Sequence, residues 1–150
     1  MQFQTIRDII DFSKEVHAEI ADRFANLSNE AVQERAKLLL DYLSRHELHL
    51  KEALQRYGES AAESLLTAWY LSAPELHPED IVHDVELFAD MDIDEVMAEA
   101  IKVDDYLIDI YRNIADNARD AKVRELSNRL LQMENTDKIK AIRNTLRIDA

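Results

Sequence analysis

The chain of 150 residues contains one glycine and two prolines. Tight hairpin turns, strand bulges and repeated β-connections depend on these residues, so their scarcity argues against all-β and doubly wound α/β folds. Hydrophobic residues make up 47% of the chain, which is enough for one sizeable core at this length. The sequence therefore predicts a single all-α domain over residues 1–150.

The charge and the cysteine content restrict the classes of function. With 31 Asp and Glu against 18 Lys and Arg, the formal net charge is −13, which repels phosphate backbones and anionic lipid surfaces. We therefore expect neither a nucleic-acid nor a membrane partner. The absence of cysteine excludes disulfides and thiolate metal sites. No long apolar run and no basic leader is present, so we expect a cytoplasmic protein.

Apolar residues recur every three or four positions along four stretches, which is typical of helices with one face in a core. The expected long helices are residues 6–27, 30–57, 93–117 and 120–147. Candidate N-caps precede the last three of these helices: Ser28 or Asn29, Asp92 or Asp94, and Asp120. Short, long and short connections between four helices favour a bundle with one crossover.

An internal repeat supports this organisation. Shifting the first helix by 87 residues places His17 on Asp104 and apolar residues on apolar residues. Shifting the second helix by 88 residues places Leu38 on Leu126 and His46 on Glu134. The sequence therefore predicts two copies of a helical hairpin. The first covers residues 1–57, the second covers residues 93–147, and a crossover with short helices covers residues 58–92.

The crossover carries an aromatic pair, Trp69 and Tyr70, among several leucines. We expect these residues to pack on the outside of the bundle as a second small core. The alternative is an exposed patch for a protein partner. A homodimer could form through this crossover lobe or through the outer faces of the helices.

Six ionisable residues fall on the apolar stripes near the middle of the long helices. They are His17, His46, His49, Asp104, Glu134 and Asp137. Burying an unpaired charge costs on the order of several kcal/mol. Residues in such places must therefore pair with one another, hold water or bind a metal. The neighbouring acids fall off the stripes, and we expect them at the surface: Glu15, Glu19, Glu47 and Glu52.

In this spacing the chain resembles the rubrerythrin and ferritin-like four-helix bundles. Those proteins place one Glu on each of two helices and a Glu-x-x-His pair on each of the other two, all directed at two metal ions. The resemblance puts the single Glu positions at His17 and Asp104, and the pairs at His46/His49 and Glu134/Asp137. It implies a ferritin-like bundle with an interior metal site in which only His49 and Glu134 keep the family's residue.

Two interpretations of the function follow. In the first, some of the six residues hold one divalent ion such as iron, manganese or zinc, and the protein is a metal-dependent oxidoreductase. A metal pair is not expected, because His46 occupies a position where the family has a bridging carboxylate. In the second, the six residues form a metal-free buried network, and the protein is a non-catalytic helical interaction or scaffold protein. Tyr106 and Tyr111 are either packing residues or redox-active tyrosines beside a metal.

Overall fold

The computed structural model describes residues 5–68 and 77–149, and the elements in these ranges are all helices. The long helices are α1 (Ile6–Glu30), α2 (Glu34–Ser60), α5 (Ile93–Asn117) and α6 (Ala121–Asp149). Two short helices, α3 (Glu63–Leu66) and α4 (Pro78–Asp84), lie in the connection between α2 and α5. The predicted all-α bundle with one long crossover is therefore confirmed. Trp69 and Tyr70 lie outside the described residues, as does the prediction made for them.

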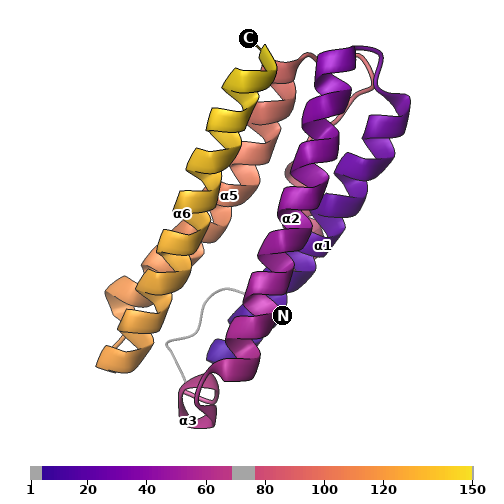
Figure 1. Cartoon of the computed structure of the whole chain (residues 1–150). Helices are drawn as coiled ribbons and strands as arrows, with labels where there is room; N and C mark the ends of the chain where they lie inside the picture. The colour runs from indigo at the N-terminus through magenta and orange to yellow at the C-terminus, as the bar shows by residue number, and fades with distance from the viewer. Residues whose placement is uncertain (1–4, 69–76, 150) are drawn as a thin grey trace.

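Figure 1 shows two antiparallel hairpins side by side, with α1 packed along α2 and α5 packed along α6. Backbone hydrogen bonds hold the crossover at both ends of the bundle. Ile6 N donates to Ala68 O (3.2 Å) at one end, and Val32 N donates to Ala89 O (2.9 Å) at the other. Because α5 begins beside the turn between α1 and α2, it runs antiparallel to α1. This is the connectivity of a bundle with one crossover.

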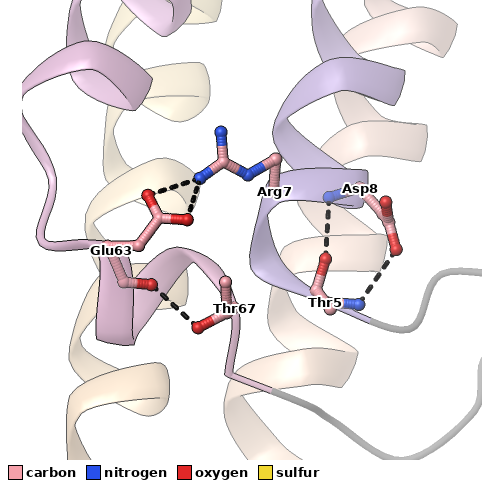
Figure 2. A network of polar contacts seen from close by, with 5 residues as sticks. All are labelled: Thr5, Arg7, Asp8, Glu63 and Thr67. Carbon is pink, nitrogen blue, oxygen red and sulfur yellow. Dashed lines mark hydrogen bonds and ion pairs between the residues drawn. The ribbon is translucent and has the colours of Figure 1, made fainter.

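Polar contacts hold the beginning of α1 (Figure 2). Thr5 Oγ1 accepts a hydrogen bond from Asp8 N at 3.3 Å, and Thr5 N donates to Asp8 Oδ2 at 3.1 Å. This reciprocal capping box satisfies backbone groups that the first turn leaves unpaired. Arg7 donates to both carboxylate oxygens of Glu63 at 2.8 and 2.7 Å, which joins α1 to α3. Thr67 Oγ1 in turn donates to Glu63 O at 2.9 Å, which closes the end of α3.

The second hairpin begins at the predicted caps. Asp92 is the N-cap of α5 and forms a capping box with Glu95. Asp120 Oδ1 accepts a hydrogen bond from Lys122 N at 2.8 Å, directly before α6. Both helices therefore start where a short acidic side chain can accept from a free backbone N–H.

The boundary between α1 and α2 differs from the prediction. Helix α1 continues through Ser28 and Asn29 to Glu30, and α2 follows an N-cap at Gln33. Ser28 is buried within α1, and its hydroxyl donates to the carboxylate of Asp41 on α2. The hydroxyl that was expected to start α2 therefore serves as a cross-helix contact.

The core lies between the inward faces of the four long helices. The apolar stripes predicted for residues 6–27 and 93–117 are buried. In the helix predicted for residues 120–147, Leu146 was expected on the buried apolar stripe, but it is 66% exposed, and the neighbouring Thr145 is buried instead. Within residues 5–68 and 77–149, no helix is both long enough and apolar enough to cross a membrane.

Candidate functional site

One ionisable side chain from each long helix meets in the interior of the bundle. These residues are His17 on α1, Glu47 on α2, Asp104 on α5 and Glu134 on α6, and each is buried. We call this group the interior cluster. Apolar residues one turn away on the same helices hold each side chain inward, as Ile20 and Ala21 do for His17.

Both ring nitrogens of His17 contact carboxylates. Nδ1 contacts the carboxylate of Glu47, and Nε2 lies 2.8 Å from Glu134 Oε1. A neutral imidazole has a single N–H donor, whereas the imidazolium has two. Two carboxylate acceptors therefore favour the imidazolium form, in which each N–H donates to one Glu. A single side chain thereby joins α1 to α2 and to α6.

The surroundings set the protonation of His17. Burial by itself lowers the pKa of His17, but the negative charges of Glu134 and Glu47, together with the hydrogen bonds to them, outweigh burial and raise that pKa well above its usual range. The two hydrogen bonds act in the same direction. His17 is thus a buried cation held by two anions, which is the arrangement that a buried charge requires.

Asp104 completes the interior cluster from α5. Burial raises the pKa of Asp104, and the charges of Glu47 and Glu134 raise it further, while His17 acts in the opposite direction. The protonated carboxyl is therefore favoured. Oδ1 of Asp104 and Oε2 of Glu134 are buried and have no hydrogen-bond partner within the described chain. An unpaired buried acceptor costs about 1–3 kcal/mol, so these two oxygens mark where a further proton, water or cation would be accommodated.

Tyr111 lies beside this cluster. Its hydroxyl donates to Ser13 Oγ at 2.6 Å, and burial followed by the charge of Glu134 raises the pKa of the phenol. Tyr106 instead lies near α4. Its pKa is raised by burial and by the charges of Asp80 and Asp84 on that helix. Of the two tyrosines considered for redox chemistry, only Tyr111 lies near the interior carboxylates.

The structure corrects the predicted phase of α2. Glu47, expected at the surface, is 2% exposed, whereas His46 is half-buried and His49 is exposed. Both His46 and Glu47 lie three or four residues from Leu43 and from Leu50, so the spacing fits either residue. The full buried row of α2 decides between them: Ala36, Leu39, Leu40, Leu43, Glu47, Leu50 and Leu54. The helix turns the apolar row inward, and Glu47 lies in that row.

A single offset relates the two hairpins. Glu47 precedes Glu134 by 87 residues, and His17 precedes Asp104 by the same number. The separate offset of 88 for the second helix is wrong, since it pairs Leu38, which is 51% exposed, with the buried Leu126. Applying the first offset to both helices would have identified Glu47 from the sequence.

The six predicted metal residues fall into two groups. His17, Asp104 and Glu134 lie in the interior cluster. His46, His49 and Asp137 instead line a pocket of about 450 Å³ between α2 and α6. Within residues 5–68 and 77–149, no group of three or more metal-ligating side chains is arranged to hold an ion.

Comparison with known proteins agrees with this architecture. No protein-family model and no curated protein matches the sequence. A solved structure from Thermotoga maritima, assigned as a ferritin-like diiron-carboxylate protein, matches with a TM-score of 0.57. The match covers 94% of each chain at 16% identity. The chain has a ferritin-like fold. At this identity the likeness is one of fold alone.

Because Glu47 rather than His46 faces the core, the residues at the ligand positions of α2 differ from those expected from the sequence. The pattern that the sequence resembles would place its two Glu-x-x-His pairs at Glu47 with Leu50 and at Glu134 with Asp137. Both glutamates of these pairs are therefore present and buried. Leu50 is buried as well and offers no ligating atom. Each hairpin has one of its three residues in common with the pattern, and Leu50 is the replacement without a ligating atom.

The raised pKa values predict that the ferritin-like bundle is more stable at mildly acidic than at alkaline pH. His17 and Asp104 bind protons more tightly in the folded than in the unfolded state, so the free energy of unfolding falls as pH rises. The contribution of His17 is complete below the ordinary imidazole pKa and is lost as pH rises through its raised folded-state pKa. Denaturant unfolding between about pH 5 and 9 measures this slope.

Two variants serve as controls for the pH slope. His49→Gln removes an exposed imidazole and should leave the slope unchanged. Replacing His17, Glu47 and Glu134 together by leucine should reduce it, because the proton of His17 is lost and the charges of Glu47 and Glu134 no longer raise the pKa of Asp104. An unfolding free energy that rises steadily from acidic to alkaline pH would contradict the protonated state assigned to His17.

Proposed function

We propose that this ferritin-like protein is a non-catalytic helical protein in which an imidazolium takes the place of a dinuclear metal centre. The observation that carries the proposal is the position of His17 between Glu47 and Glu134. In the ferritin-like family that the sequence resembles, the glutamates of the Glu-x-x-His pairs bridge the metal ions. Here the cation that neutralises both glutamates is a side chain of the protein itself.

A metal pair does not fit the residues present. Both nitrogens of His17 already contact carboxylates, and a doubly protonated imidazole has no lone pair to offer a metal. Leu50 occupies a ligand position with a buried apolar side chain. The first hairpin therefore supplies Glu47 alone, whereas two ions need bridging and terminal ligands on both sides.

A buried charged cluster suits a structural role. His17 reaches Glu47 and Glu134 together only in one alignment of the helices, so the cluster opposes sliding of α2 against α1 and α6. A shift of α2 by one residue would replace Glu47 with His46 and leave the buried imidazolium short of a counter-charge. The cluster thus supports a defined outer surface on the bundle.

The outer surface of α6 carries apolar side chains that favour an interaction role. Ile139 is 42% exposed and Leu146 is 66% exposed. They are seven residues apart and therefore lie on one side of the helix. Exposed apolar groups that share a helix face are typical of contacts with another helix.

Elemental analysis of protein purified without an affinity tag tests the proposal. We expect metal far below one equivalent, and an unchanged thermal midpoint after addition of a chelator or of iron, manganese or zinc. A metal that binds only the folded state would raise the midpoint by mass action. One tight equivalent whose removal lowers the midpoint would contradict the metal-free role.

A second candidate function rests on the unpaired oxygens of Asp104 and Glu134. The two oxygens come from α5 and α6, the two helices of the second hairpin. In this function the second hairpin holds one divalent ion such as iron, manganese or zinc, and the protein is a metal-dependent oxidoreductase. Calorimetric titration with Mn²⁺ or Zn²⁺ should then show one bound equivalent of metal in the natural chain. The control Asp109→Asn, at an exposed position on α5, should bind the same amount. Asp104→Asn and Glu134→Gln should lose it.

A further inference from the structure

The pocket between α2 and α6 is separate from the interior cluster. It has a volume of about 450 Å³ and is lined from α2 by Arg45, His46 and His49, and from α6 by Asp137 and Lys140. Small-molecule sites in proteins have volumes of roughly 300–1,000 Å³. The pocket is therefore large enough for a small organic molecule.

The charge balance of this pocket is opposite to that of the whole chain. Arg45 and Lys140 are cationic, and Asp137 is the carboxylate that lines the pocket, whereas the chain has a formal net charge of −13. Such a local excess of positive charge attracts anions and repels metal cations. The imidazoles of His46 and His49 add hydrogen-bonding groups to the pocket and add no negative charge.

The wall of the pocket combines an apolar surface with polar side chains. Leu50 is buried, and the ring of Tyr42 stacks on the ring of His46 with centroids 5.6 Å apart. Asn144 Nδ2 donates to the hydroxyl of Tyr42 at 2.7 Å, which holds the aromatic ring in place. Nε2 of His46 is buried and has no hydrogen-bond partner in the described part of the chain. A ligand with both an apolar and a polar part matches this wall.

We propose that the pocket binds a small organic anion. Its apolar or aromatic body would pack on Tyr42 and Leu50, and its carboxylate or phosphate group would pair with Arg45 and Lys140. Binding here goes beyond the metal-independent role, because the interior cluster can be free of metal whether or not the pocket is filled.

Nuclear magnetic resonance titration of the whole protein tests the ligand class. The probes are benzoate and phenyl phosphate, with inorganic phosphate, benzyl alcohol and benzylamine for comparison. We expect at least one aromatic anion to shift the amide signals of residues 42–53 and 137–140, with a dissociation constant of about 1 mM or lower. The carboxylate and phosphate probes distinguish the two anionic groups. Benzyl alcohol should bind at least about 10-fold more weakly, and benzylamine more weakly still.

Matched variants locate the binding site. Arg45→Ala and Lys140→Ala should each weaken binding of the anion by about 5-fold or more, whereas Lys51→Ala on α2 and Arg143→Ala on α6 should not. Asp137→Asn should strengthen binding, because it removes the opposing negative charge. Three results would overturn the proposal: no binding of either aromatic anion up to about 10 mM, equal binding of benzylamine, or shifts confined to other parts of the molecule.

Discussion

Replacing His17 with leucine is expected to lower the free energy of unfolding by about 3–5 kcal/mol. The change removes the buried cation and leaves the carboxylates of Glu47 and Glu134 in the core without a counter-charge. Packing alone cannot account for such a loss, since leucine fills a volume similar to that of histidine. Denaturant unfolding at one fixed, mildly acidic pH measures the effect.

Replacing His17, Glu47 and Glu134 together by leucine provides the decisive control. This variant removes the cation and both anions at once, so no unpaired charge remains between them. We expect its unfolding free energy to lie within about 1 kcal/mol of the natural chain, or above it. His49→Leu, at an exposed position, should change it by less than about 0.5 kcal/mol. A triple variant as unstable as His17→Leu would show that these residues are not a self-neutralising unit.

The architecture could be predicted because two of the long helices leave no choice of phase. Along α1, Ile6, Ile9 and Ile10 are followed by Val16, Ile20 and further apolar residues, and all of them are buried. The stripe of α5 is equally continuous. Capping acids such as Asp92 then fix where the helices start. Both features depend on residues close together in the sequence, and in natural proteins such local preferences agree with the final fold.

The site could be predicted only in part, because the deciding residue of α2 is a glutamate. Glutamate is seldom fully buried unless it is paired, so Glu47 gave no sign of lying in the core. Its partner His17 comes from another helix, thirty residues away in sequence. Hydropathy alone therefore placed His46 inward, and with it His49. The constant repeat offset was the one signal in the sequence that distinguished the two phases.

Asp137 shows a second reason for the division of the six residues. It lies one turn beyond Glu134, and it is half-buried at the pocket. Burial raises its pKa, as expected for a carboxyl group that is partly removed from water. Spacing along one helix cannot show whether a position lies in the core or at its edge.

Building the family's complete ligand pattern on the residues that face the core is expected to create a protein that binds two equivalents of iron. The variant combines His17→Glu, Leu50→His, Asp104→Glu and Asp137→His, and it keeps Glu47 and Glu134. It places a single carboxylate on α1 and on α5 and a Glu-x-x-His pair on α2 and on α6, which is the family's arrangement. Bridging carboxylates can then hold two ions roughly 3–4 Å apart. Ferrous iron titration followed by stopped-flow absorbance measures uptake and oxidation.

A second variant with the same number of changes tests whether Glu47 or position 46 is the inward ligand position of α2. It combines His17→Glu, His46→Glu, Asp104→Glu and Asp137→His, and so builds the α2 pair on the residues that line the pocket. We expect it to bind at most one equivalent. It should also be less stable than the natural chain, because the new carboxylate at position 17 would face Glu47 and Glu134 without a cation between them. Circular dichroism separates failure to bind from failure to fold. Two equivalents in this variant, or fewer than two in a folded variant of the first design, would show that Glu47 is not the bridging position of α2.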